Sequence, residues 1–385
     1  MSRMARLEQI PWWNSAMLAE ATVLLAGVGA VGNEVLKNLA LMGVGRVVLV
    51  DRDKVALHNL SRSVLFRPEH VGMAKAKAAA ESALGLAPEA VFVPLEMDVA
   101  KVSPALAAWV DVAIGALDSL AAQVRLGRLC RVAGIPWVQG GLGDATDLFK
   151  ATLATHPGEE GPCLECRLPE GLGDRLLAED LPRGGCAEAG REAEAAGGVP
   201  STPMTASILG GLLALEALAV LHARRGLPGP DSPPAWGTHA HWNLRVPSVH
   251  ALRGTTVRPE CPWHEPVRVH RLDRQMANLP IAHLWDVLGP SGMAGLEGHL
   301  VRHAACPGCR ASADWRWCPD LPAPCPHCGT PDPAAESLRH LPRAHAQCAR
   351  TPRALGIPPG IGLRWFDGDE AWTVTWPGVL GDLSP

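Results

Sequence analysis

A short apolar run, three spaced glycines and a helical pattern follow one another near the start of the chain. Residues 22–26 (TVLLA) form the apolar run, Gly27, Gly29 and Gly32 form G-x-G-x-x-G, and residues 31–42 have helical spacing. Glycines at these positions permit a tight turn and let the backbone approach a ligand at the helix N-terminus. The feature therefore predicts a nucleotide-binding turn between the first strand and the first helix of an α/β fold.

The pattern of apolar strands and helices continues well beyond the glycine turn. Further apolar runs that suit buried strands lie at residues 46–50, 91–95 and 110–114 and from residue 136, and a helical pattern covers residues 120–132. Continuous apolar strands separated by helices are typical of a parallel sheet covered on both faces. Asp51 ends the second strand, nineteen residues after Gly32, where a carboxylate can accept hydrogen bonds from ribose hydroxyls. The sequence therefore predicts a Rossmann-like, doubly wound and mostly parallel sheet.

The chain changes character after this region. Residues 167–203 are rich in Gly, Pro, Ala and Glu, so we expect a mobile crossover segment there. An apolar helix should begin near Met204, and short strands are expected within residues 240–252. The composition then turns rich in Pro, His and Trp, which predicts a first domain at residues 1–265 and a small C-terminal domain at residues 266–385.

Composition limits the classes of protein to which the chain can belong. Its 385 residues suit two or three domains of roughly 150 residues each. The net charge of −4 argues against nucleic acid as the main partner, because phosphate binding needs a basic excess. No apolar signal segment is visible at the N-terminus, so we expect a cytoplasmic location. The apolar stretch at residues 206–222 contains Glu216, which favours a buried helix over a membrane span.

Polar residues suited to a nucleoside triphosphate follow Asp51. The chain reads N-L-S-R from Asn59 to Arg62 and then V-G-M-A-K ending at Lys75, and Asp118 comes just after the fourth strand. Arginine and lysine side chains suit a polyphosphate tail with a leaving pyrophosphate. One carboxylate at the carboxyl edge of the strands, together with phosphate oxygens and waters, suits Mg²⁺. We therefore expect ATP and Mg²⁺ as ligands, with Asp118 at the magnesium ion.

Taken together, these motifs resemble the MoeB/ThiF/HesA ubiquitin-activating-enzyme-like superfamily. The resemblance covers about residues 3–265 and includes G-I-P-W-V-Q-G-G at residues 134–141 and an R-x-x-R segment at Arg3 and Arg6. It implies adenylation, in which the C-terminal glycine carboxylate of a ubiquitin-like or sulfur-carrier protein attacks the α-phosphate of ATP. In the family the second arginine reaches the ATP of the partner subunit. The resemblance therefore also implies a homodimer in which Arg6 acts in trans.

The resemblance assigns roles to a set of polar residues, namely Asp51 for the ribose, Asn59 for the phosphate region, and Arg62, Lys75 and Arg6 for the transferring and departing phosphates. Two positions depart from the family pattern. Ser63 stands where the family usually has glutamine, and Ser119 stands where it often has asparagine. Serine keeps the capacity to hydrogen-bond but has a shorter reach.

Cysteine pairs suggest two zinc sites, since C-x-x-C spacing without a visible secretory signal favours metal over disulfides. The resemblance implies a structural zinc site at Cys163, Cys166, Cys261 and His264, the last in place of a family cysteine. Independently of the family, Cys306, Cys309, Cys325 and Cys328 form two C-x-x-C pairs separated by fifteen residues. This spacing is typical of a zinc ribbon, here at about residues 303–331.

One cysteine outside both sets is a candidate nucleophile. Cys186 lies in the crossover segment near Arg183 and Arg191, whose charges favour a partly ionised thiol. Related proteins carry a cysteine about this far beyond the first zinc pair, and in some of them it takes up the activated carboxylate as a thioester. The resemblance therefore implies transfer to Cys186, with a conjugating enzyme as a possible further partner.

Three other interpretations stay open on the sequence alone. The chain could adenylate a peptide or a small carboxylate, with Cys186 idle. It could be an NAD-dependent oxidoreductase, which would explain the glycine turn and Asp51 but would leave Arg62, Lys75 and Asp118 without a role. It could also be a zinc-ribbon binding module with a degenerate nucleotide fold. The sequence does not identify the carrier protein or separate sulfur transfer from protein conjugation.

Overall fold

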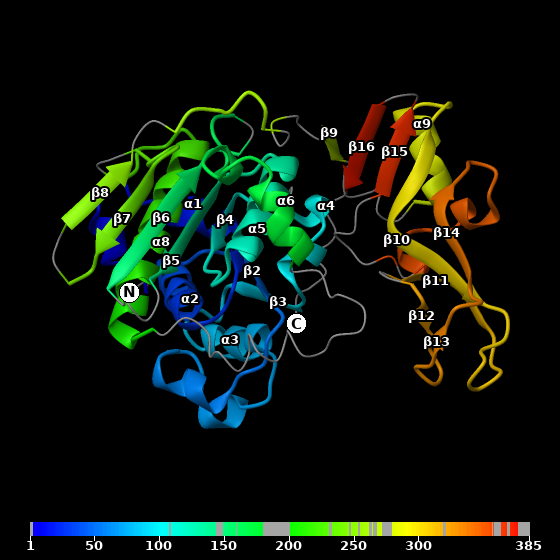
Figure 1. The fold of residues 1–385 in the computed structure, drawn as a ribbon, viewed down its shortest axis with the longest axis horizontal. Coiled ribbons are helices and arrows are strands. Elements are labelled where there is room, and N and C mark those ends of the chain that lie inside the picture. Colours follow the sequence, from blue (N-terminus) through cyan, green and yellow to red (C-terminus); the bar gives the residue numbers. More distant parts are fainter. Residues whose placement is uncertain are drawn as a thin grey trace. The chain divides into compact units, whose positions relative to one another are not determined.

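The protein is described from a computed structural model and divides into two compact units (Figure 1). The structure describes residues 3–107, 109–143, 149–158, 160–179, 201–230, 233–245, 248–252, 255–261, 264, 268–271, 279–318, 321–355, 357, 363–367 and 370–375. The first unit comprises Met1–Val102 and Val110–Pro266, and the second comprises Ser103–Trp109 and Val267–Pro385. The sequence placed residues 103–109 in the first domain. They group with the second because the short helix α4 (Pro104–Ala107) packs on strand β16 (Glu370–Thr375).

A central sheet organises the first unit. Within the described residues it has eight strands in the order β3-β2-β1-β4-β5-β6-β7-β8. The strands are β1 (Thr22–Ala26), β2 (Arg46–Asp51), β3 (Val91–Glu96), β4 (Val112–Gly115), β5 (Trp137–Leu142), β6 (Lys150–His156), β7 (His239–Asn243) and β8 (Ser248–Leu252). Strands β1 to β5 pair in parallel, whereas β6, β7 and β8 are added antiparallel. The predicted α/β fold with a mostly parallel central sheet is confirmed.

Burial on both faces explains why the parallel strands read as continuous apolar runs. Leu25 of β1 pairs in register with Leu49 of β2 and Ile114 of β4, and all three side chains are fully buried. An alternating polar residue in such a strand would face a covering helix and lose its hydration without a partner.

Strand β6 was not predicted. Its sequence, KATLATH, mixes polar and apolar residues instead of forming an apolar run. It pairs on both sides, with Gln139 of β5 opposite Ala154 and with Ala240 of β7 opposite Leu153. The neighbouring strands therefore decide its conformation. Strands β7 and β8 confirm the strands expected within residues 240–252.

Helices cover both faces of the sheet; they include α1 (Ser15–Glu20), α2 (Ala30–Met42), α3 (Lys75–Leu84), α5 (Leu120–Ala133), α6 (Leu172–Glu179) and α8 (Pro203–Arg224). Helix α2 packs against α3 and α8, and α8 also lies on β4, β5 and β6. Helix α5 packs against β4, β5 and α6. Since the strand order reverses between β1 and β4, right-handed crossovers place α2 and α5 on opposite faces. Ligands bind at the carboxyl ends of the strands at such a reversal point.

Helix α6 corrects one expectation. Residues 167–203 were expected to form a mobile connection, yet Leu172–Glu179 are helical. The helix packs on α5, and its Asp174 carboxylate accepts a hydrogen bond from Arg128 Nη2 at 2.6 Å. Leu172 and Leu176 are four residues apart, the spacing of one helical face, which the unusual composition of the segment obscures.

Helix α8 is long and apolar enough to cross a membrane by length and composition, but 61% of its most apolar window is buried inside the protein. Glu216 on this helix accepts hydrogen bonds from Thr155 Oγ1 at 2.9 Å and from the Ala235 N–H at 2.6 Å. These contacts tie α8 to β6 and to the chain before β7. They agree with the buried helix expected from the sequence.

The second unit is built on an antiparallel sheet. Within the described residues its strands are β9 (Arg268–Arg271), β10 (Met293–His303), β11 (Ala313–Cys318), β14 (Glu336–Leu341), β15 (Leu363–Asp367) and β16, and β12 (Ala323–Pro324) pairs separately with β13 (Pro331–Asp332). One contact at its core is an edge-on pair of buried rings, Trp285 of α9 (Leu284–Leu288) and Trp365, with centroids 4.9 Å apart. Strand β9 joins β16 in parallel, unlike the other pairs.

Candidate functional site

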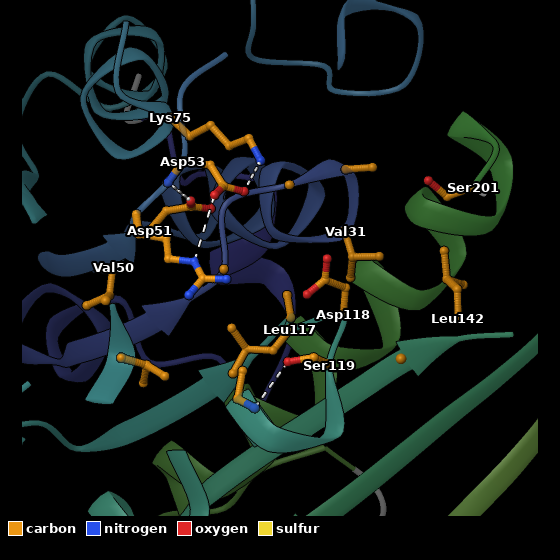
Figure 2. A pocket seen from close by; sticks show the side chains of 18 of the residues that line it. Val31, Val50, Asp51, Asp53, Lys75, Leu117, Asp118, Ser119, Leu142 and Ser201 are labelled. Atoms are coloured by element: carbon orange, nitrogen blue, oxygen red, sulfur yellow. Dashed lines mark hydrogen bonds and ion pairs between the residues drawn. The ribbon is translucent and has the colours of Figure 1, made fainter. Parts of the chain in front are cut away.

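One cleft in the first unit collects most of the residues that the sequence predicted to bind a nucleotide. It has a volume of about 240 Å³ and lies at the carboxyl ends of β1, β2 and β4. The predicted residues that line it are Gly27, Gly29, Asp51, Asn59, Arg62, Lys75 and Asp118. Figure 2 shows Asp51, Asp53 and Lys75 gathered on one side of the cleft, with Asp118 apart from them.

The three glycines of the turn serve different purposes. Gly27 has a φ of +86°, and a Cβ on it would lie 2.4 Å from the Ala116 carbonyl oxygen. A Cβ on Gly32 would lie 2.0 Å from the Gly27 carbonyl oxygen, so both glycines permit close packing of backbone. Gly29 is the N-cap of α2, and a Cβ there would meet nothing within 4 Å. Gly29 therefore offers open space beside the first N–H groups of the helix, where an anion is favoured.

A buried asparagine braces the glycine turn. Asn33 Nδ2 donates to the carbonyl oxygens of Val28 and Gly29, at 2.8 and 3.0 Å. Its Oδ1 accepts a hydrogen bond from the Leu65 N–H at 2.9 Å. One side chain thus joins the turn to the loop that carries Arg62.

Asn59 and Arg62 reach the cleft from the 3-10 helix η2 (Leu57–Ser61) and the residue that follows it. Asn59 is buried, and its Oδ1 accepts a hydrogen bond from the Ala56 N–H at 2.8 Å. Arg62 Nη1 donates to the His58 carbonyl at 2.9 Å. Ser63 is buried and lies outside the cleft lining.

Asp51 supports the turn and remains able to bind a ligand. Its Oδ2 accepts a hydrogen bond from the Val28 N–H at 2.7 Å and its Oδ1 accepts one from the Asp53 N–H at 2.8 Å. Burial raises the pKa of this carboxyl above its usual range, an effect that the nearby charge of Lys75 and the two hydrogen bonds oppose. Each carboxylate oxygen keeps a second lone pair, so Asp51 can also accept hydrogen bonds from ribose hydroxyls.

Acidic and basic groups are balanced in the cleft lining, which holds Asp51, Asp53, Asp98 and Asp118 together with Arg52, Arg62, Lys75 and Arg125. Lys75 Nζ lies 2.8 Å from Asp53 Oδ2, and the Lys75 side chain is only 13% exposed. Arg52 Nη1 lies 2.8 Å from Asp98 Oδ2. The Lys75 ammonium has three N–H donors, so it can bind a phosphate oxygen while it keeps its contact with Asp53.

Asp118 is the carboxylate best placed for a cation. It is exposed at the end of β4 and has no hydrogen bond or ion pair with any residue that the structure describes. A single free carboxylate beside a phosphate site suits Mg²⁺, which keeps waters and phosphate oxygens as its other ligands. Ser119 Oγ accepts a hydrogen bond from the Ala122 N–H at 3.2 Å and so caps helix α5.

The two arginines of the N-terminal R-x-x-R segment differ in their contacts. Arg3 Nη1 donates to the Ala40 carbonyl at 3.3 Å, and its Nη2 pairs with Glu89. Arg6 is exposed and lies outside the cleft lining, and it makes no hydrogen bond or ion pair with the described residues. Arg3 therefore anchors the segment on the first unit and leaves Arg6 available to another molecule.

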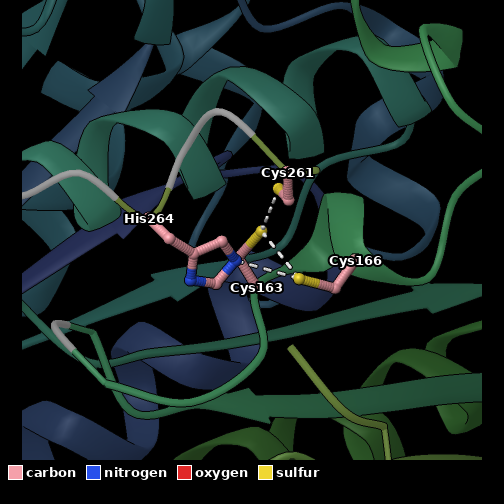
Figure 3. Close-up of side chains that lie close together, drawn as sticks. All are labelled: Cys163, Cys166, Cys261 and His264. Carbon is pink, nitrogen blue, oxygen red and sulfur yellow. Dashed lines mark hydrogen bonds between the residues drawn. The ribbon is translucent and has the colours of Figure 1, made fainter. Parts of the chain in front are cut away.

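The first predicted metal set is gathered from two distant parts of the first unit (Figure 3). Cys163 Sγ lies 3.8 Å from Cys166 Sγ and 3.6 Å from Cys261 Sγ. Tetrahedral zinc with Zn–S bonds of about 2.3 Å sets sulfur atoms roughly 3.8 Å apart, so the thiols fit the ion. His264 Nε2 lies 2.9 Å from Cys166 Sγ, closer than the roughly 3.5 Å that a shared zinc would set, so the imidazole must move outward to bind.

Two arginines on α5 contact residues of this metal set or residues next to them. Arg128 donates to both carboxylate oxygens of Glu165, at 2.7 and 2.9 Å, between the two cysteines of the first pair. Arg131 Nη2 lies 2.7 Å from His264 Nδ1, and its Nη1 contacts the Gly158 carbonyl. Arginine can only donate, whereas a neutral imidazole that binds zinc through Nε2 carries its proton on Nδ1. Zinc binding therefore also requires Arg131 to turn away from His264.

The second predicted metal set is formed by two matching loops in the second unit; its ligands are Cys306, Cys309, Cys325 and Cys328. In each loop the residue two positions after the first cysteine donates its N–H to that cysteine's sulfur, at 3.3 Å for Gly308 and 3.4 Å for His327. The residue four positions after the first cysteine donates its N–H to the carbonyl oxygen of that cysteine, at 2.8 Å for Arg310 and 2.9 Å for Gly329.

The sulfur atoms of this set also lie at zinc-compatible distances. The separations are 3.6 Å between Cys306 and Cys328 and 3.8 Å between Cys309 and Cys325. Hydrogen bonding by the Thr330 side chain and backbone lowers the pKa of Cys328 to about 6, which favours the thiolate that zinc binds. Both cysteine clusters could therefore hold zinc.

One predicted site residue and four cleft residues that were not predicted remain to be described. Cys186, the predicted nucleophile, lies outside the described residues. Arg52, Asp53, Asp98 and Arg125 line the cleft although the sequence analysis did not single them out. Arg52, Asp53 and Asp98 lie within two residues of the ends of β2 and β3, a position that could have marked them.

Comparisons with known proteins identify a matching family and several similar proteins. The ThiF family matches residues 1–262 of the chain. The SAMP-activating enzyme E1 of Haloferax volcanii is 33% identical over 174 residues, which cover 44% of this chain and 61% of that protein. The molybdopterin-synthase adenylyltransferase of Escherichia coli is 29% identical over 207 residues, covering 53% of this chain and 74% of that protein. The chain spans between 22% and 61% of the length of the first three curated relatives that it matches.

A solved structure shows the same fold. MccB of E. coli, determined with MccA-N7isoASN, superposes with a TM-score of 0.53 over 69% of this chain and 75% of that chain, at 17% sequence identity. At this identity the likeness concerns the architecture alone.

Proposed function

The chain belongs to the ThiF family, and on that premise we propose that it is an ATP- and Mg²⁺-dependent activating enzyme. Its substrate would be the C-terminal glycine of a ubiquitin-like or sulfur-carrier protein, which it adenylates. The observation that carries the proposal is the single cleft that joins Gly29, Asp51, Arg62, Lys75 and Asp118. Relatives named as activating enzymes and as an adenylyltransferase support the same class of reaction.

The proposed reaction begins with a carboxylate oxygen of the carrier protein attacking the α-phosphorus of ATP. The new bond joins that oxygen to phosphorus, and the bond from phosphorus to the bridging oxygen of pyrophosphate breaks. Asp51 orients the ribose, and the N–H groups at Gly29 hold phosphate oxygens at the start of α2. Lys75 donates to the phosphates from its place beside Asp53, and Arg62 adds a second positive charge. Magnesium bound at Asp118 would supply further charge neutralisation.

Two further steps belong to the proposal. Arg6 would complete the cleft of a second copy in a homodimer, which accords with its exposure and its lack of contacts within the described part of its own chain. The thiolate of Cys186 would then attack the acyl carbon of the adenylate, forming a thioester and releasing AMP. Conjugation would follow by transfer of the acyl group from Cys186 to a conjugating enzyme as the next partner. Sulfur transfer would need a sulfide-level donor as well, whose sulfur attacks the acyl carbon and displaces the Cys186 thiolate.

A second candidate keeps the adenylation and changes the substrate. A peptide or small carboxylate could supply the attacking oxygen, and Cys186 would then stay idle. The NAD-dependent alternative loses support, because Arg62, Lys75 and Asp118 share the cleft with the glycine turn and hydride transfer has no use for them.

The test is pyrophosphate exchange into ATP, measured with Mg²⁺ and a panel of small proteins that end in Gly-Gly. Wild-type protein should exchange only with a carrier that has the tail. Asp118→Ala should abolish exchange, and Glu81→Ala, an exposed change on α3 outside the cleft, should not alter it. Exchange with a peptide and with no carrier would favour the second candidate. Failure to bind Mg-ATP would refute both.

A further inference from the structure

Three histidines occupy neighbouring positions in the antiparallel part of the central sheet, where β6, β7 and β8 run side by side (Figure 1). His239 and His241 belong to β7 and are separated by one residue. His250 of β8 is directly opposite His241 in the register of the two strands. Residues two apart on a strand, and residues directly opposite each other in an antiparallel pair, belong to the same face of a sheet. All three positions therefore share one face.

This face is the one opposite helix α8. Ala240, between the two histidines of β7, is buried and in register with Leu153 of β6, which belongs to the same apolar core as Leu213 of α8. The residues in register with His239 and His241 on β6 are Ala154 and Thr152. Both are small, so they leave room beside the imidazole rings.

The ring of His239 needs a partner. Its Nδ1 and Nε2 are both buried, and neither has a hydrogen-bond partner among the described residues. A neutral imidazole has one donor and one acceptor, and leaving both unpaired in a buried position is unfavourable. Such a group indicates a bound water or a bound ion.

The neighbouring ring favours an ion. His241 is exposed, and its ring stacks on that of His239 with the centroids 4.7 Å apart and the planes at 18°. Two imidazoles that share a tetrahedral zinc with Zn–N bonds of about 2.0 Å have centroids roughly 5 Å apart, so the two rings already have a suitable separation. Nearly parallel rings cannot both direct a lone pair at one ion. One ring must therefore turn about χ2, a soft torsion, and the exposed ring of His241 is able to do so.

We propose that His239 and His241, with His250 as the third ligand, bind a divalent transition-metal ion such as zinc. Imidazole nitrogen suits zinc, copper and nickel, whereas magnesium and calcium prefer oxygen. Three protein ligands leave a fourth position open to water or to another small ligand. Neither His239 nor His241 lines the nucleotide cleft, so this site is separate from the proposed adenylation. Because one ring is exposed, the ion exchanges with solvent, and protein purified without added metal would keep only the ions of the cysteine clusters.

The experiment is calorimetric titration of the full chain with Zn²⁺. The protein is first supplied with zinc and then washed with citrate, which removes weakly bound ions. Wild type should bind one further ion per chain. His241→Gln removes an exposed ring, so it should fold like wild type and weaken this binding at least about tenfold, because even the loss of an outer-shell partner typically costs about 10–100-fold in metal affinity. His239→Gln and His250→Gln should have the same effect.

A matched control makes the outcomes decisive. His340→Gln, which removes an exposed histidine on β14 of the second unit, should bind zinc like wild type. Wild-type protein that takes up no further ion would overturn the inference and leave an ordered water as the partner of His239. Unchanged binding in any of the three variants, or an equal loss in His340→Gln, would show scattered surface binding and overturn it as well. The comparison does not depend on how much zinc the cysteine clusters hold or on whether the chain exchanges pyrophosphate, so it stands apart from the proposed function.

Discussion

Alanine at Gly29 and alanine at Gly32 should separate ligand binding from folding. Both glycines belong to the same turn motif, yet an added Cβ would meet nothing within 4 Å at Gly29 and a carbonyl oxygen at 2.0 Å at Gly32. The neighbour of Gly32 is the backbone of Gly27, which cannot rotate away as a side chain could. The first variant should therefore fold and lose nucleotide binding, whereas the second should lose stability.

The magnitudes follow from these environments. At Gly32 the helix preference for alanine over glycine returns about 1 kcal/mol, but overpacking costs about 1–3 kcal/mol, and contact with backbone favours the upper end. We expect a net loss of about 2 kcal/mol in the free energy of unfolding. At Gly29 the loss of the N-cap preference and the reduced entropy of the unfolded chain nearly cancel, leaving a change within about 1 kcal/mol.

The assay combines urea unfolding with titration by Mg-ATP. Gly29→Ala should keep its urea midpoint and bind at least about tenfold more weakly, equivalent to about 1.4 kcal/mol, because the methyl group occupies the open space beside the helix N-terminus. Gly32→Ala should show a clearly lower midpoint. Wild-type affinity in Gly29→Ala would refute the assignment of that space to phosphate. Equal stabilities of the two variants would refute the packing argument.

Four further predictions follow from other parts of the molecule. Mixing inactive Arg6→Ala with inactive Asp118→Ala protein should restore about a quarter of wild-type exchange if Arg6 acts in trans in a dimer, and no recovery would contradict it. Elemental analysis should find two zinc ions per chain, one for each cysteine cluster, and chelation should lower the melting temperature; a content below one would contradict the assignment. Burial lowers the pKa of His156 from 6.5 to about 4, so the unfolded chain binds an extra proton between these values and stability should fall by about 3 kcal/mol as the pH drops across them. His156→Phe should flatten that part of the pH profile, and an unchanged slope would argue against the assignment. Arg128→Ala should cost about 3 kcal/mol because it leaves the Glu165 carboxylate, 10% exposed, without its partner, and a loss below about 1 kcal/mol would count against a structural role for the pair.

Much of the fold and the chemistry could be predicted because local patterns specify them. Apolar runs such as residues 22–26 and 46–50 become buried parallel strands, since only a continuous apolar strand suits a sheet covered on both faces. The cysteine spacings likewise predicted which side chains gather in each cluster. Strand β6 and helix α6 escaped prediction, because their conformations depend on neighbours from other parts of the chain.

Tertiary structure decided which residue of the site has which role. The sequence shows three glycines of equal appearance, and only the approach of Ala116 and Gly27 distinguishes the two packing glycines from Gly29. The sequence identified Lys75 as a phosphate ligand but could not show its ion pair with Asp53, twenty-two residues away.

The same distinction applies to the R-x-x-R segment and to the end of the cleft beside β2 and β3. Arg3 and Arg6 look alike in the sequence, but Arg3 is held by Ala40 and Glu89. Arg52 and Asp98 meet because β2 and β3 run parallel and end together. Residue types and short spacings thus determine what chemistry the chain can perform. Which group faces the ligand depends on contacts between distant segments, and these are set by packing free energy summed over the whole sheet and its helices.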